Sequence, residues 1–282
     1  MRKRNYSKKQ MTFIIAGSLA AIVLAIVLNH IHPVKTSPGK ETEPGTVTDT
    51  AVSAKDTGEG NKAVKKPRQT PRPEEGVATF LQGPKSWKSR LEWSGEWGDA
   101  YYDGGKFGGF GCGLCCMANL YTSLTPYRCS PLDMYRYAKK ISGYSGGSAI
   151  DWGYIKETLL SAGLISDVGR KPASYVEFQK KARESLALLV VVSSQNSTCY
   201  WKDTPGHYVT LFLYDEGKDS IFLADSGDPN HNRHWVPLKK IFRSLKTANR
   251  WQFLEVTKYN PKDDSWKHSD FGGNCVLPDG WE

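Results

Sequence analysis

The sequence lacks the features of a nucleotide-binding or nucleic-acid-binding protein. No Gly-x-Gly-x-x-Gly occurs in the glycine-rich stretch before Cys112, so a dinucleotide-binding loop is not indicated. Most of the formal net charge of +9 lies in residues 1–76, with 13 Lys and Arg against 7 Asp and Glu, whereas residues 77–282 hold 25 against 22. The charges of this second part are interspersed and form no basic stripe, so we expect no nucleic-acid partner.

The spacing of a metal site is also missing. The six cysteines do not have the spacing of a four-ligand zinc site. His231 and His234 stand three residues apart in an Asn-rich loop, and such a turn does not orient two imidazoles toward one ion. We interpret it as a polar loop beside the functional site, where either histidine could contact a substrate. Neither a metal nor a cofactor is expected.

Charged side chains are absent from residues 11–28, and a helix of this length spans about 27 Å, close to the hydrocarbon thickness of a bilayer. A group of lysines and arginines precedes the run, and no small-x-small cleavage site follows it. This predicts an uncleaved transmembrane anchor over residues 11–31, behind a basic cytoplasmic tail at 1–10, with the rest of the chain outside the cell membrane. A cleaved signal peptide is the alternative interpretation.

Large apolar residues are scarce in residues 32–76, where Thr, Pro, Lys, Glu and Gly predominate. Such a segment cannot offset its ordering entropy, so we expect a disordered tether. Residues 77–259 are expected to form the folded domain. The C-terminal tail, residues 260–282, carries no chemistry that we can assign, and is expected to be a strap across the domain surface or to form a disulfide through Cys275.

Within the folded domain, helical signals come first and strand signals second. Caps, first-turn prolines and apolar periodicity predict helices over residues 112–124, 130–140, 151–163 and 174–186. Apolar runs predict strands over 188–192, 208–214, 221–225 and 250–258, with a short helix over 237–245. The aromatic, Gly-rich stretch that reaches Cys112 is expected to be an irregular loop. This order indicates an α+β domain of two parts with a cleft between them.

Cys112 stands where the glycine-rich coil enters the first helix, between Gly111 and Gly113. The unpaired N–H groups and the positive dipole end of a helix N-terminus favour the thiolate, which is the nucleophilic form of cysteine. The flanking glycines leave the backbone bare, so a substrate chain could approach closely. Two other interpretations are a buried hydrophobe or disulfide partner, and a redox pair with Cys115.

A predicted hairpin brings a histidine and a carboxylate together. If Asp215 faces Asp219 across the turn, strand pairing places Val209 opposite Asp225, with His207 one diagonal step away on the same face. Such a pair is often only structural. A catalytic thiol, however, needs an imidazole to take and return its proton, and the imidazole needs a third group to orient it.

Four short motifs, taken in order, resemble the papain-like cysteine peptidases related to the bacteriocin-processing, double-glycine-leader peptidases, in particular their stand-alone exported relatives. The motifs are Gln82 with Trp87, Gly111-Cys112-Gly113 with Met117-Ala118, Gly206-His207-Tyr208-Val209, and Leu223-Ala224-Asp225 with Asp228-Pro229. The resemblance covers roughly residues 79–257. It implies a papain-like domain of two lobes, with the cysteine in a helical lobe and the histidine and aspartate in an antiparallel sheet lobe.

The resemblance also implies a role for each matched residue. Cys112 is the nucleophile, His207 the general base and acid, Asp225 the orienting group, and Gln82 a donor to the oxyanion. Gln82 lies 30 residues before Cys112, whereas compact relatives place it only a few residues ahead, so the aromatic loop between them would have to fold out of the way.

The expected function is therefore that of a membrane-anchored extracellular cysteine peptidase, which hydrolyses peptide bonds of a peptide or protein substrate through a thioester acyl-enzyme. One alternative keeps the chemistry and changes the substrate to the stem peptides of peptidoglycan. A second alternative is a non-enzymatic binding module that retains the fold. The sequence does not indicate an oligomeric state.

Overall fold

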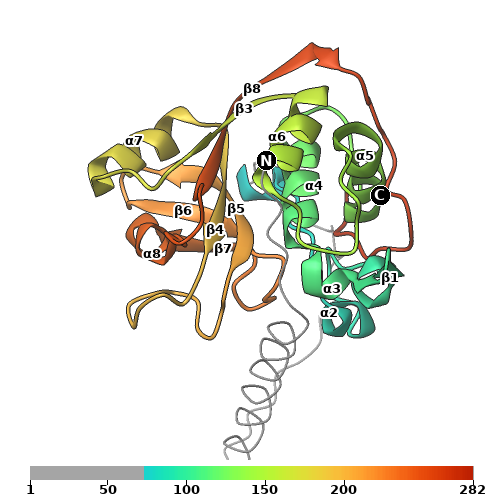
Figure 1. Cartoon of the computed structure of the whole chain (residues 1–282), viewed down its shortest axis with the longest axis horizontal. Coiled ribbons are helices and arrows are strands. Elements are labelled where there is room, and N and C mark those ends of the chain that lie inside the picture. The colour runs from blue at the N-terminus through green and yellow to red at the C-terminus, as the bar shows by residue number, and fades with distance from the viewer. Residues whose placement is uncertain (1–72, 282) are drawn as a thin grey trace, which may run out of the picture. The chain divides into compact units, whose positions relative to one another are not determined.

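A mixed α+β fold is built on one antiparallel sheet that has helices on both faces (Figure 1). The computed structural model describes residues 73–281, which belong to one compact unit. The predicted cytoplasmic tail (1–10), the predicted anchor (11–31) and nearly all of the predicted tether (32–76) lie outside the described residues. Among residues 73–281, no helix is both long enough and apolar enough to cross a membrane.

A helical lobe covers one face of the sheet. Its three main helices are α4 (Cys112–Leu124), α5 (Pro131–Ser142) and α6 (Trp152–Ser161). α5 begins where the sequence predicts, because Ser130 and Asp133 form a reciprocal capping box and Pro131 occupies the first turn. α4 is buried along nearly its whole length, which its lack of a polar face requires. The first residue of this central helix is Cys112.

The sheet has six strands in the order β3-β8-β4-β5-β6-β7, and all neighbours pair antiparallel. The strands are β3 (Ala162–Gly169), β4 (Ala187–Val192), β5 (His207–Asp215), β6 (Ser220–Ala224), β7 (His234–Pro237) and β8 (Phe253–Asp264).

Side-chain alternation along the strands divides the apolar core into two layers. Tyr208 and Phe212 of β5 pack in the core of the helical lobe. Val209 and Leu211 belong to a second core on the opposite face of the sheet. The helices of that face are α7 (Tyr175–Glu184) and α8 (Leu238–Ser244). β5 and β6 are therefore held from both sides, which makes their ends a rigid support for a site.

Two strands of the six-stranded sheet, β3 and β7, were not expected from the sequence. Gly163, which we expected to end the third helix, lies inside β3 with a φ of 74°. A Cβ at this position would come within 2.7 Å of the carbonyl oxygen of Asn260 in β8. The glycine therefore serves an irregular pairing of β3 with β8, where the register shifts, rather than a helix end.

The stretch expected as an irregular loop before Cys112 contains several short elements instead. They are α2 (Pro84–Lys88), the 3-10 helix η2 (Glu96–Asp99), β1 (Tyr101–Tyr102), β2 (Gly105–Lys106) and α3 (Phe107–Phe110). A further 3-10 helix, η1 (Pro73–Gly76), opens the described part of the chain. The buried indoles of Trp93 and Trp97 explain why this stretch is regular, since each indole packs edge-on against Phe80.

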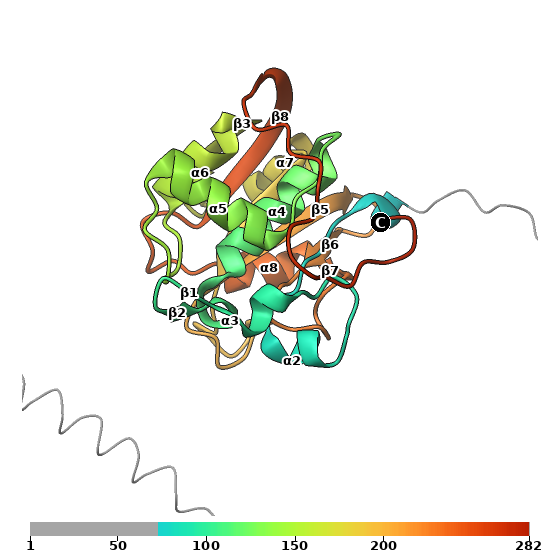
Figure 2. The ribbon, with the colours of Figure 1, turned by 90° about the vertical axis from the view of Figure 1, so that its right-hand side faces the viewer.

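The predicted boundary between domain and tail, at residue 259, falls inside β8. After β8 the chain runs over the helical side of the domain (Figure 2). The Trp281 ring lies 4.9 Å from the Trp93 ring, and the backbone N–H of Trp93 donates a hydrogen bond of 2.6 Å to Val276. All six cysteines are free, Cys275 included. Residues 265–281 therefore form a strap rather than a disulfide-linked tail.

Candidate active site

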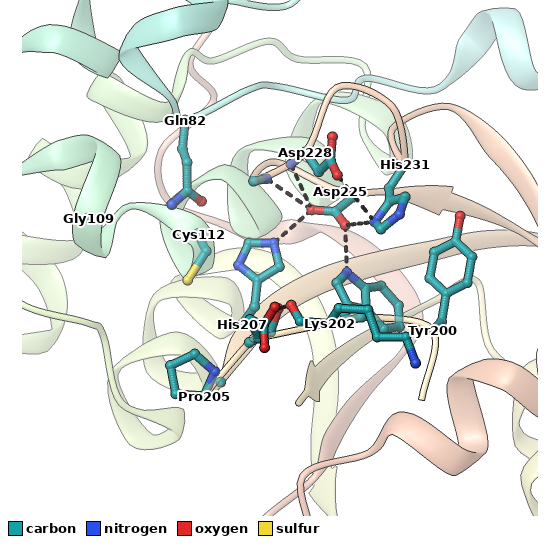
Figure 3. A pocket seen from close by; sticks show the side chains of 15 residues that line it. Gln82, Gly109, Cys112, Tyr200, Lys202, Pro205, His207, Asp225, Asp228 and His231 are labelled. Atoms are coloured by element: carbon teal, nitrogen blue, oxygen red, sulfur yellow. Dashed lines mark hydrogen bonds and ion pairs between the residues drawn. The ribbon is translucent and has the colours of Figure 1, made fainter. Parts of the chain in front are cut away.

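A cleft of about 510 Å³ opens beside the start of α4 and the start of β5 (Figure 3). All four site residues predicted from the sequence line this cleft: Gln82, Cys112, His207 and Asp225. Its remaining walls come from the loop before β5, the loop after β6, and Gly109. The structure thus brings together residues from three distant parts of the chain.

Cys112 is buried at the start of α4, and its sulfur lies beside the ring of His207 (Figure 3). Gly113 allows this helix start to pack closely, because a Cβ there would lie 2.5 Å from a methyl group of Ile150. Burial by itself raises the pKa of the Cys112 thiol. The hydrogen bond and charge of His207, with the backbone N–H groups of Tyr208 and Gly113, outweigh burial and lower that pKa below its ordinary value. The thiolate is therefore favoured.

His207 is the first residue of β5, and its two ring nitrogens have different partners. Nε2 lies 2.8 Å from Oδ1 of Asp225. Because a carboxylate only accepts hydrogen bonds, Nε2 carries a hydrogen, and Nδ1 is left on the side of the ring that faces Cys112 (Figure 3). Burial lowers the pKa of His207, but the hydrogen bonds and charges of Asp225 and Cys112 raise it to about 10. The lowered pKa of Cys112 and the raised pKa of His207 both favour transfer of the proton from the thiol to the imidazole.

Asp225 directly follows β6, and its side chain is 1% exposed. Oδ1 accepts hydrogen bonds from His207 and from the backbone N–H of Gly227 at 2.9 Å, and Oδ2 accepts one of 2.7 Å from Nε1 of Trp201. Burial raises the pKa of Asp225, but its hydrogen bonds with His207 and Trp201 and the nearby imidazole of His231 hold it far below its ordinary value. A fixed, ionised carboxylate in turn fixes the orientation of the His207 ring.

The pairing of β5 with β6 has the expected register where it supports the site. Thr210 lies opposite Ala224. One further step in the same register gives Asp225 its expected position beside the start of β5. Near the turn the expectation was wrong, because Asp215 lies opposite Ser220 rather than Asp219. Leu213, with a φ of 53°, marks a bulge there. The extra residue is absorbed at the turn, so the site end of the hairpin keeps its register.

Gln82 is nearly buried and is held at both ends of its side-chain amide. Nε2 donates a hydrogen bond of 2.9 Å to the carbonyl of Gly108, and Oε1 accepts one of 2.7 Å from Oγ of Ser226. Among the described residues, no other acceptor binds Nε2, so its second hydrogen is available to a ligand in the cleft. The amide points toward Cys112 (Figure 3).

The segment between Gln82 and Cys112 folds back on itself. The two residues therefore line one cleft although 30 positions separate them in the sequence. Two glycines make the close return possible. A Cβ at Gly98 would lie 2.8 Å from the carbonyl oxygen of Gly83, and a Cβ at Gly108 would lie 2.9 Å from Pro84. With α2, η2 and α3 packed in this way, Gln82 reaches the cleft that holds Cys112.

Three side chains that support Asp225 or Gln82 were not identified from the sequence. Trp201 donates to Asp225, and Ser226 donates to Gln82. Asn232 accepts a hydrogen bond of 3.0 Å from the backbone N–H of Asp225 and donates one of 2.8 Å to the carbonyl of Thr79. Of the three, only Asn232 lies in a segment that the sequence indicated, the polar loop expected beside the functional site.

A second hollow of about 530 Å³ adjoins the cleft and shares Gln82, Gly227 and Asp228 with it. Its other walls include Pro84, Lys85 and Ser86 of α2 and Pro229 and Asn230 of the loop after Asp228.

The other thiols of α4 differ from Cys112. Cys115 and Cys116 are fully buried, and burial raises the pKa of each well above its ordinary value. No bond joins Cys112 to Cys115. Within residues 73–281, no three His, Cys, Asp or Glu side chains are placed to hold a metal ion together.

No protein-family model matches the chain. No curated protein matches it either. Among solved structures, one from Bacillus anthracis, described as a "putative C39-like peptidase", has 13% sequence identity and a TM-score of 0.36, over 53% of this chain and 90% of that chain. A likeness of this size carries no conclusion, and what the site can do follows from its own geometry.

Proposed function

We propose that this chain is a cysteine peptidase that hydrolyses peptide bonds through Cys112, His207 and Asp225. One observation carries the proposal: Nε2 of His207 is held 2.8 Å from Asp225, and the opposite side of the same ring faces the sulfur of Cys112 (Figure 3). An activated thiol, a base and an orienting carboxylate are the three parts that nucleophilic acyl transfer requires.

The first half of the reaction forms a thioester. The thiolate of Cys112 attacks the carbonyl carbon of the substrate, and the carbonyl oxygen becomes an oxyanion. The free N–H of Gln82 donates a hydrogen bond to this oxygen and stabilises its charge. The imidazolium of His207 then gives its proton to the nitrogen of the leaving amine as the C–N bond breaks. An acyl-enzyme and a free amine result.

The second half restores the enzyme. His207, now neutral, takes a proton from a water molecule, and the oxygen of that water attacks the thioester carbonyl. The C–S bond breaks, the acid product leaves, and the proton on His207 again faces the thiolate. Asp225 stays ionised throughout and holds Nε2–H, so that Nδ1 is the atom that exchanges protons.

The test of this assignment is the site of covalent labelling by a thiol-directed electrophile on the full-length protein, located by mass spectrometry. We expect the adduct on Cys112. Cys112→Ala should abolish peptide cleavage and leave the thermal unfolding midpoint nearly unchanged, whereas Cys275→Ala, at a half-buried thiol, is the matched control and should cleave normally. Cleavage by Cys112→Ala at the wild-type rate would overturn the proposal.

Two assays separate the alternatives in substrate and class. Release of soluble fragments from purified cell wall, but no cleavage of casein or a peptide library, would assign the chain to peptidoglycan stem peptides. A binding module without activity would leave Cys112 unlabelled by the electrophile.

We further propose that residues 11–31 anchor the domain to the outer side of the cell membrane. The support is the uncharged run at 11–28 behind a basic N-terminus. The full-length protein should sediment with membranes and resist extraction by salt, and protease added to intact cells should digest it. Recovery of the full-length protein in the soluble cytosolic fraction would contradict this localisation.

A further inference from the structure

His231 lies on the side of Asp225 away from His207 (Figure 3). Its Nδ1 is 3.5 Å from Oδ2 of Asp225 and 3.7 Å from the carboxylate of Asp228. This nitrogen is buried, and among the described residues it has no hydrogen-bond partner. Two carboxylates this close favour the protonated form of the ring, because they balance its charge.

The ring of His231 is fixed in place by aromatic neighbours. Tyr200 packs on it with ring centroids 4.4 Å apart, and Trp201 meets it edge-on at 6.2 Å. One buried carboxylate therefore lies between two imidazoles, one of which faces the sulfur of Cys112 (Figure 3). The titratable and charged groups around His231 are Asp225, Asp228, Tyr200, His207 across Asp225, and Lys240, which lies over the Tyr200 ring.

We propose that His231 is a positioning residue, which sets how much of the charge of Asp225 acts on His207 and thereby sets the pH range in which Cys112 and His207 work. The inference rests on the proposed peptidase function. It adds a side chain that does not touch the substrate bond and acts through Asp225.

The physical reason is that Asp225 has one negative charge to share. When His231 is protonated, it balances part of that charge and also repels a proton on His207. The imidazolium of His207 is then a stronger acid toward the leaving amine, and the added positive charge favours the thiolate of Cys112. When His231 is neutral, Asp225 acts on His207 alone. Asp225 raises the pKa of His231, so the charged form persists to a higher pH than in a free histidine.

Two substitutions separate these states. His231→Gln removes the charge, so the lower limb of the pH dependence of Cys112 alkylation by iodoacetamide should move to higher pH by roughly half a unit to one unit. His231→Arg keeps a charge at all pH values, so the upper limb of kcat/KM for a peptide should move to lower pH by a similar amount. The matched control is His234→Gln, an exposed histidine outside the cleft, which should leave both limbs in place.

The outcomes distinguish this inference from the proposed function. Limbs that do not move in either His231 variant, with the overall rate lowered or unchanged, would leave His231 a structural residue and overturn the inference. Failure of the wild type to label at Cys112 would overturn the peptidase proposal itself. A loss of folding in one variant is recognised by its thermal unfolding midpoint, and the other variant then carries the test.

Discussion

Nε1 of Trp201 donates a hydrogen bond of 2.7 Å to Oδ2 of Asp225, the carboxylate oxygen that His207 does not use. Both groups are buried, with Trp201 3% and Asp225 1% exposed. A buried carboxylate that loses a hydrogen-bond donor still has the full cost of desolvation, but it loses part of the hydrogen bonding that offsets this cost. The indole therefore helps to keep Asp225 ionised and in one orientation.

Trp201→Phe should lower the free energy of unfolding by about 1.5–3 kcal/mol, the usual worth of a hydrogen bond to a charged group. It should also lower kcat, since Asp225 becomes free to turn away from His207. Chemical denaturation and steady-state kinetics on one preparation measure both effects. Trp235→Phe, at an exposed indole on β7, is the matched control and should change neither quantity. Equal behaviour of the two variants would mean that the indole hydrogen bond contributes neither to stability nor to kcat.

The pH dependence of cleavage should be bell-shaped and broad. Protonation of Cys112 ends activity on the acid side, and because the pKa of Cys112 is lowered, this limb should lie below the usual range of a thiol. Loss of the proton on His207 ends activity on the alkaline side, and its pKa of about 10 places that limb well above neutrality. Measurement of kcat/KM against pH gives both limbs.

Cys275 offers an internal control for this profile. Burial raises the pKa of its thiol, so its alkylation should begin only at alkaline pH, where that of Cys112 has already levelled off. Mass spectrometry of the alkylated protein reports the two sites separately. Parallel pH curves for both cysteines would show that no ion pair activates Cys112.

Gln82→Ala should lower kcat by roughly 10²-fold to 10³-fold with little change in KM, because the lost hydrogen bond forms only as the oxyanion develops. Ser226→Ala tests the support of the same amide. It removes the hydrogen bond of 2.7 Å to Oε1 of Gln82 without removing the donor, so a smaller loss of kcat is expected. A rise in KM at constant kcat in Gln82→Ala would place this side chain in substrate binding instead.

The sequence was informative wherever a local rule decides the structure. The capping box at Ser130 fixes the start of α5, and turn chemistry together with period-two alternation predicted the β5–β6 pairing next to the site. Cys112 at a helix start and His207 at a strand start followed from the same reasoning. The contact between Asp225 and His207 needed only that pairing and one diagonal step.

What the sequence could not supply depends on contacts between distant segments. β3 is a strand because β8 pairs with it, and nothing local to Gly163 reveals that partner. Trp201 reaches Asp225 from the loop before β5, and Gln82 is positioned by Ser226 far along the chain. The bulge at Leu213 was missed because a single extra residue near a turn leaves the hydrophobic pattern almost unchanged.

Gly227 is the residue whose substitution tests the position of the His207 ring most directly. A Cβ at Gly227 would lie 3.0 Å from both Cε1 and Nε2 of His207, so the ring would have to move by a few tenths of an ångström. The hydrogen bond of 2.8 Å to Asp225 and the alignment with Cys112 both depend on that position. Its backbone conformation places no restriction against alanine, since its φ is not in the left-handed region.

Gly227→Ala should therefore lower kcat by roughly threefold to thirtyfold, because small displacements of a catalytic group reduce the rate steeply. Gly153→Ala is the matched control: this helical glycine has nothing within 4 Å of an added Cβ, so activity should be unchanged and the free energy of unfolding should rise by about 0.5–1 kcal/mol. Steady-state kinetics and thermal unfolding of both variants measure these effects. Full activity in Gly227→Ala would show that the His207 ring has room to move and that its observed position is not required for the reaction.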